Sequence, residues 1–135
     1  MIWLLLGLAA FLLPHSLRVF APGLREARIR DHGAVRWKMA YSVVAIAGFA
    51  LLVWGFSMAR AQPVLVWAPP TAMRHVAALL TLPAFILLVA AYVPRNHFKA
   101  RLGHPMLLAV KLWALAHLLA SGWLHSMLLA GAFLV

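Results

Sequence analysis

Residues 39–59 read MAYSVVAIAGFALLVWGFSMA and contain no charged side chain. As a helix this segment rises about 31 Å, which matches the roughly 30 Å hydrocarbon core of a bilayer. Its polar members, Tyr41, Ser42 and Ser57, lie near the two ends, where a spanning helix reaches the interfacial region. The segment therefore predicts a transmembrane helix.

The composition of the whole chain also favours a membrane location. Hydrophobic residues make up 66% of its 135 residues, against about 45–50% in soluble domains. A soluble fold of this size buries only about two-thirds of its unfolded surface, so large apolar patches would remain in water. We therefore expect the lipid bilayer to be the main partner of this chain. The absence of cysteine excludes disulfides and thiolate metal sites.

Further apolar segments extend the prediction to an all-α, polytopic transmembrane helical bundle of four to five helices in a single domain, residues 1–135. The apolar segment at residues 2–20 has no positive charge before it and no cleavage site after it, as a signal peptide would, so we expect it to remain as a helix. The last rises only about 20 Å and would cross thinly, end within the bilayer or continue the preceding helix. The expected helices are residues 2–20, 39–59, 71–93, 104–121 and a short 123–135.

The cations concentrate in two segments between the expected spans. Residues 18–38 carry six and residues 94–103 carry three, whereas residues 60–71 carry Arg60 alone. Because Lys and Arg accumulate in cytoplasmic loops, we expect loops 18–38 and 94–103 to face the cytoplasm from a bacterial inner (cytoplasmic) membrane. The basic residues do not alternate with aromatic residues along a soluble surface, so we expect no nucleic-acid partner.

Titratable residues inside the expected spans are candidates for function, because a charged or titratable group in hydrocarbon costs several kcal/mol. No carboxylate lies in any span, which excludes paired-carboxylate chemistry, an aspartate relay and an HExxH zinc site. Imidazoles without carboxylates or thiols suit haem ligation, and each one taken singly also suits a hydrogen bond between helices. The candidates are His15, Arg74, His75, His104, Lys111 and His117.

Residues 101–122, RLGHPMLLAVKLWALAHLLASG, closely resemble the signature of the NnrU family. Residues 48–55 (GFALLVWG), 67–70 (WAPP) and 83–94 (PAFILLVAAYVP), together with Ala59-Arg60 and Arg74-His75, are similar to the same family. NnrU proteins are bacterial inner-membrane proteins linked to denitrification and nitric oxide metabolism. Their relatives include the plastid zeta-carotene isomerase, a haem b protein that converts a cis double bond to trans.

The resemblance implies haem b as the cofactor, with His15 and His117 as the axial ligands of the iron. On this hypothesis Arg74 or Lys111 pairs with a haem propionate, and His75 and His104 orient or replace a ligand. The isomerase has an exchangeable Cys three residues before its second ligand. Here Ala114 occupies that position, so a thiolate ligand switch does not carry over.

The expected depth of each histidine in the membrane does not decide which two histidines bind the iron. His15 would lie near the cytoplasmic end of its helix and His117 about 20 Å from the cytoplasmic start of its own, at roughly 1.5 Å per residue. On depth alone, His75 with His117, or His15 with His104, pair better. A bend at Pro14 or tilted helices would bring His15 and His117 to the same depth.

Three classes of function follow. The first is a haem b membrane protein of nitric oxide metabolism, which includes a haem-dependent isomerase acting on a hydrophobic small molecule such as a polyene. The second is a non-catalytic accessory or assembly protein for denitrification membrane proteins, without a cofactor of its own. The third is a membrane methyltransferase, which shares the Arg-x-x-His-Pro element but needs a later acidic motif that residues 1–135 lack.

Overall fold

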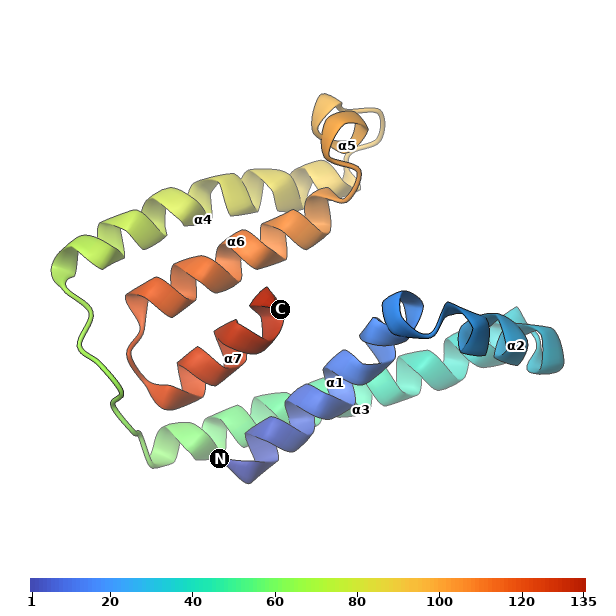
Figure 1. Cartoon of the computed structure of the whole chain (residues 1–135), viewed down its shortest axis with the longest axis horizontal. Helices are drawn as coiled ribbons and strands as arrows, with labels where there is room; N and C mark the ends of the chain where they lie inside the picture. Colours follow the sequence, from blue (N-terminus) through green and yellow to red (C-terminus); the bar gives the residue numbers. More distant parts are fainter. The chain divides into compact units, whose positions relative to one another are not determined.

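The computed structural model consists of α-helices joined by short segments (Figure 1), and it describes the side chains of residues 1–17 and 20–135. The expectation of an all-α fold is confirmed. In chain order the helices are α1 (Ile2–Phe20), α2 (Pro22–His32), α3 (Ala34–Ala61), α4 (Thr71–Tyr92), α5 (His97–Leu102), α6 (Pro105–Ala120) and α7 (Leu124–Leu134).

The observed helices coincide with the expected spans except at α3. This helix was expected over residues 39–59, but it begins at Ala34 and ends at Ala61. Its 28 residues rise about 42 Å, so its ends extend beyond a hydrocarbon core of roughly 30 Å. By length and composition, α3 and α4 can cross a membrane, and the bent pair of α1 and α2 adds a third only if the two helices form one span. The shorter apolar helices α6 and α7 leave the total of four to five spans a prediction.

Both segments that were expected to be loops contain a helix. Pro22 occupies the first turn of α2, where its missing N–H leaves no partner unsatisfied, and Gly33 ends the helix at φ 85°. The Asn96 side chain accepts a hydrogen bond from Lys99 N at 2.9 Å at the start of α5. Gly103 ends α5 at φ 68°. Local end signals therefore define these two polar helices, which have no long apolar run.

The chain divides into two compact units, residues 1–62 and 63–135, and the first is built on the contact between α1 and α3 (Figure 1). A Cβ placed on Gly55 would lie 2.5 Å from Leu4 N, and Leu4 is fully buried in this contact. In a membrane, helices associate by close backbone packing, which small residues allow. Three glycines of this unit are so close to the other helix that an added Cβ would lie less than 3.0 Å from its backbone. They are Gly7, Gly48 and Gly55.

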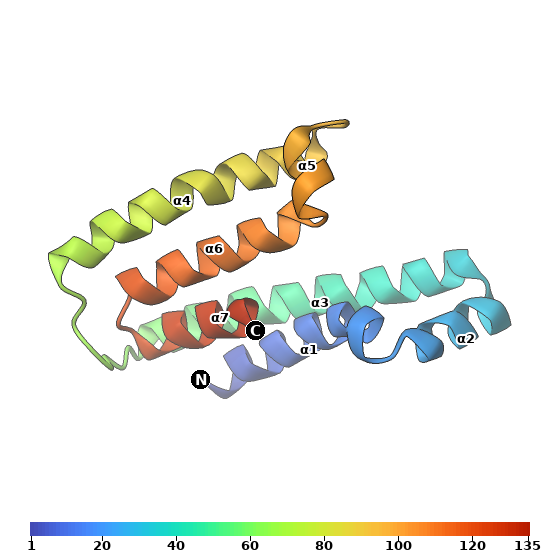
Figure 2. The same cartoon turned by 45° about the horizontal axis from the view of Figure 1, so that its top comes forward.

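In the second unit, α6 lies between α4 and α7 (Figures 1 and 2). The segment before α4 runs extended and pairs with the turn between α6 and α7: Val66 N donates to Gly122 O at 2.8 Å, and Leu124 N donates to Val64 O at 2.8 Å. The helices of this unit pack through small side chains. Its buried alanines are Ala77, Ala84, Ala90, Ala109, Ala114, Ala116 and Ala130.

The long apolar helices expose most of their surface. Only 22% of the most apolar window of α3, and the same share in α4, is buried inside the chain. Side chains such as Ile46 and Leu79, which are 69% and 72% exposed, would be in contact with water if the chain were soluble. These apolar helices fit a lipid bilayer, as the composition predicts.

Candidate functional site

His15 lies on an exposed part of α1, one turn after Phe11. Its Nδ1–H donates to the Phe11 carbonyl oxygen at 2.6 Å, because a carbonyl can only accept. The imidazole packs on the Phe11 ring at a centroid distance of 4.4 Å and on the Tyr41 ring of α3 at 5.4 Å. This tautomer leaves Nε2 as the ring nitrogen with a free lone pair.

His117 repeats this arrangement in the second unit. It lies exposed near the end of α6, and its Nδ1–H donates to the Trp113 carbonyl oxygen at 2.9 Å. Its ring packs on the Trp113 ring at a centroid distance of 4.4 Å. In both helices an aromatic residue therefore precedes the histidine by four positions, its ring contacts the imidazole, and its carbonyl oxygen accepts the hydrogen bond from Nδ1–H.

The arrangement suits ligation of a metal by Nε2. A ligating histidine commonly donates its other ring N–H to a backbone carbonyl, which fixes the tautomer and the ring orientation. Among the described residues, neither His15 nor His117 has a hydrogen bond at Nε2. In the described part of the chain, no three His, Asp or Glu residues gather closely enough to hold a metal ion by themselves. Haem iron takes only its axial ligands from the protein, so an isolated imidazole with its Nε2 available suits haem better than it suits a bare metal ion.

Among the described residues, the side chains of the other four candidates make no hydrogen bond or ring contact with one another. Arg74 and His75 are exposed in the first turn of α4, and His104 is exposed immediately before α6. Lys111 is half-buried on α6, and its Nζ donates to Val135 O at 3.5 Å. Within the described residues of the second unit, no hydrogen bond or ring contact joins these four side chains to each other or to His117.

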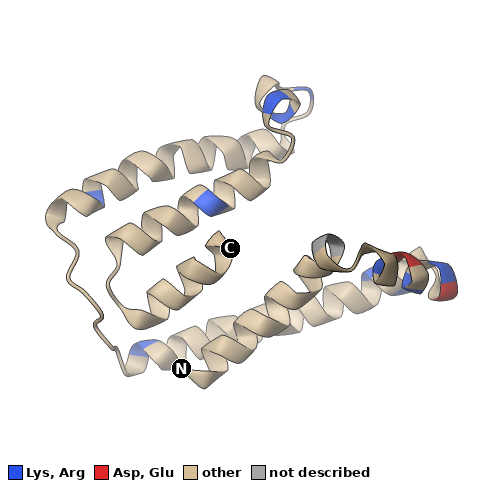
Figure 3. Cartoon of the chain, viewed as in Figure 1, with Lys and Arg blue, Asp and Glu red and all other residues tan. Residues whose placement is uncertain are grey.

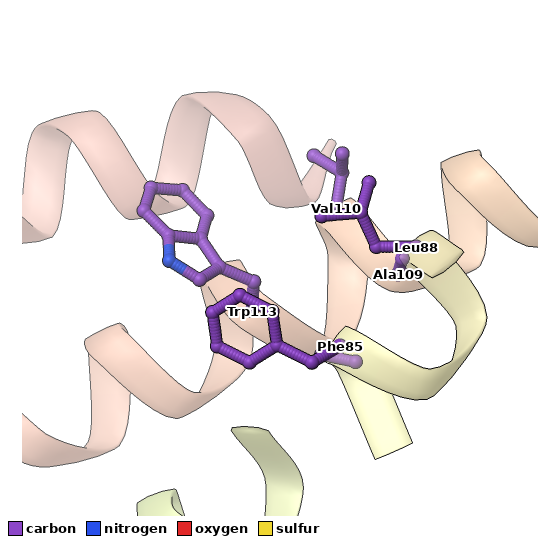
Figure 4. Close-up of a pocket in the computed structure, with 6 residues that line it drawn as sticks. Phe85, Leu88, Ala109, Val110 and Trp113 are labelled. Carbon is purple, nitrogen blue, oxygen red and sulfur yellow. The ribbon is translucent and has the colours of Figure 1, made fainter. Parts of the chain in front are cut away.

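An apolar groove of about 240 Å³ lies between α4 and α6 (Figure 4). Trp113 lines this groove, and its ring also contacts the His117 ring. The imidazole therefore lies next to the wall of the groove. Phe85 of α4 lies close to the Trp113 indole in the close-up view. The groove is lined by Ala84, Phe85, Leu88, Ala109, Val110 and Trp113.

The family model described as NnrU protein matches residues 3–135. The chain belongs to the NnrU family. The resemblance noted in the segments between residues 48 and 122 is thus confirmed, and the match extends through both units. No curated protein and no solved structure matches this member of the NnrU family.

Sequence reasoning missed two features of this NnrU family member. The first is the aromatic partner of each histidine, which a search for aromatic residues four positions before His15 and His117 would have found. The second is His125, which is only 5% exposed in the first turn of α7. Its ring stacks near Trp123 at a centroid distance of 6.5 Å. No local pattern indicates this burial, because it arises from packing within the second unit.

Proposed function

We propose that this NnrU family member is a haem b protein of the bacterial inner membrane, with Nε2 of His15 and of His117 as the axial ligands. The observation that carries the proposal is the shared local geometry of the two histidines. Each has Nδ1–H bound to the carbonyl four residues earlier and Nε2 available. Imidazoles without a carboxylate or thiolate bound to them are ligands that suit a b-type haem.

When bound, haem supplies an iron that exchanges single electrons and coordinates small diatomic molecules. The chain contributes cations for the propionates, and Arg74 and Lys111 are the residues proposed for this role. The only hydrogen bond of the Lys111 ammonium among the described residues is the 3.5 Å contact with Val135 O, so a propionate would be a stronger acceptor. His75 and His104 are exposed imidazoles that would orient or replace a ligand.

The proposed setting is nitric oxide and denitrification metabolism, or haem-dependent isomerisation of a hydrophobic small molecule. The groove between α4 and α6 supports an apolar ligand, because its lining carries no charged side chain. Its volume of about 240 Å³ lies below the roughly 300–1,000 Å³ of pockets that enclose a whole drug-sized ligand. The groove would therefore hold one segment of a long apolar molecule beside Trp113 and His117.

The decisive experiment is an absorption spectrum with a pyridine haemochrome assay on the purified full-length chain. We expect a Soret band that shifts on reduction, and a several-fold lower ratio of haem to protein in His15→Ala and in His117→Ala. His32→Ala and His97→Ala are matched controls, because these imidazoles are exposed on the polar helices α2 and α5. They should retain the wild-type ratio.

The result also separates the ligand assignment from haem binding itself. If His15→Ala and His117→Ala keep the wild-type haem content while His75→Ala or His104→Ala loses it, haem is bound by another pair. If the purified chain carries no haem and cannot be loaded with it, the proposal is wrong.

The second candidate function is a non-catalytic accessory protein for a denitrification membrane complex. The large apolar side chains that α4 exposes, such as Leu79 and Val89, suit contact with partner helices as well as with lipid. Co-purification of a reductase subunit with a haem-free chain would favour this function over haem binding.

A further inference from the structure

The helix α2 carries a basic face that the chain does not neutralise. Arg25, Arg28 and His32 follow one another at intervals of three and four residues, so at about 100° per residue they lie within roughly 60° of one another. All three are exposed. Glu26 and Asp31 lie about 90° or more from the centre of this face. Among the described residues, no ion pair joins Glu26 or Asp31 to the basic face.

The direction of α2 suits the surface of a membrane. The axis of α2 makes an angle of 81° with that of residues 2–17 of α1. If α1 crosses the bilayer, α2 lies nearly parallel to the membrane plane at the level of the headgroups. Phe20 and Leu24, at 84% and 49% exposed, supply apolar side chains at this level.

Charge in this segment points to an anionic surface. Residues 22–38 contain five cations, Arg25, Arg28, Arg30, Arg36 and Lys38, against Glu26 and Asp31, which gives a net charge of +3. Figure 3 shows that the acidic residues of the whole chain also lie here. A second copy of the chain is a poor partner, because its own residues 22–38 carry the same net charge of +3 and would repel this segment.

We propose that α2 is a membrane-surface helix whose basic face binds the phosphates of anionic phospholipid headgroups. Guanidinium groups bind phosphate oxygens through paired N–H donors, and Arg25 and Arg28 present two such groups one turn apart. The exposed Leu24 and Phe20 side chains enter the upper acyl region and fix the depth of the helix. This binding holds the cytoplasmic end of α1 and is independent of any cofactor.

The test uses the absence of native cysteine. An environment-sensitive fluorophore on the Leu24→Cys variant of the full-length chain reports the surroundings of α2 in nanodiscs. Phosphatidylglycerol replaces phosphatidylcholine stepwise, and the half-saturating mole fraction of phosphatidylglycerol is measured. Each cation near an anionic surface contributes a factor of about five to this binding. We expect Arg25→Gln/Arg28→Gln to raise the half-saturating fraction by roughly 25-fold, which abolishes saturation in practice.

The matched control is Arg30→Gln/Arg60→Gln, which removes the same charge from outside the basic face. Arg30 lies on the opposite side of α2, and Arg60 lies in the last turn of α3. This control should keep the half-saturating fraction within about two-fold of the parent, and about 1 M salt should weaken the response of the parent by screening.

Four outcomes would overturn the proposal. In the first outcome, the probe would respond equally to the two lipids. In the second, both double variants would shift the response by the same amount, which would indicate unspecific charge attraction. Free glycerol phosphate at millimolar concentration reproduces the response, which indicates a small-anion site. The probe responds to an added acidic peptide but not to phosphatidylglycerol, which indicates a protein partner.

Discussion

Replacing Gly55 by alanine tests the close contact of α1 and α3. The new Cβ would lie 2.5 Å from Leu4 N, 2.5 Å from Trp3 C and 2.6 Å from Trp3 O, whereas ordinary contacts are 3.4–4 Å. These three atoms are backbone and cannot move aside without moving α1. Forcing the helices apart costs about 3 kcal/mol, the upper end for overpacking by a methyl group. The better helix propensity of alanine returns about 1 kcal/mol, so we expect a net loss of roughly 2 kcal/mol.

Gly131→Ala is the matched control, because a Cβ on Gly131 in α7 meets nothing within 4 Å. It should gain about 1 kcal/mol from helix propensity. The two variants therefore differ by about 3 kcal/mol, a factor of roughly 150 in the unfolding equilibrium. Reversible unfolding of the full-length chain in mixed micelles of increasing sodium dodecyl sulfate measures both values. If Gly55→Ala is within about 0.5 kcal/mol of Gly131→Ala, the close backbone packing of α1 on α3 is wrong.

Two further substitutions test the second unit. In Gly122→Ala the new Cβ would overlap the Trp67 carbonyl oxygen, so the hydrogen bonds between the extended segment and the turn should break. We expect a loss of about 2 kcal/mol and faster amide exchange at Val66, and unchanged exchange there would contradict the pairing. In Asn96→Ala the side chain loses its bonds to Ala90 O at 2.7 Å, Val93 O at 2.6 Å and Lys99 N, which should destabilise the chain by about 2 kcal/mol. Asn96→Asp keeps the acceptor for Lys99 N and should recover about half of this loss, as measured by the same unfolding assay.

The apolar helices were predictable from the sequence, because a run of some twenty apolar residues has few alternatives to a transmembrane helix. Residues 39–59 and 71–93 gave α3 and α4 to within a few residues, apart from the longer start of α3. The helices α2 and α5 were missed, because they contain many charges and depend on Pro22, Gly33, Asn96 and Gly103 at their ends. The positive φ of the two glycines is a backbone property that charge counting does not indicate.

The candidate site was predictable only in part. His15 and His117 were among the titratable residues of the apolar segments, which are rare and costly in hydrocarbon, but only the resemblance to the NnrU family selected them as a pair. Their common conformation follows from spacing, since Phe11 and Trp113 precede them by one helical turn. The burial of His125 and the groove beside Trp113 depend on how α4, α6 and α7 pack, and no periodicity within one helix encodes this.

Within each unit the close helix contacts do not depend on the exposed histidines, although the His15 ring also contacts Tyr41 of α3. Glycines hold α1 against α3, and alanines hold the second unit together, so neither contact needs an imidazole. A polar nitrogen in lipid costs free energy unless it has a partner. The carbonyls of Phe11 and Trp113 satisfy Nδ1 of each ring, and Nε2 gains a partner only from outside the described hydrogen bonds. A cofactor that binds Nε2 would offset this cost at both positions, which supports the proposal that His15 and His117 are ligands.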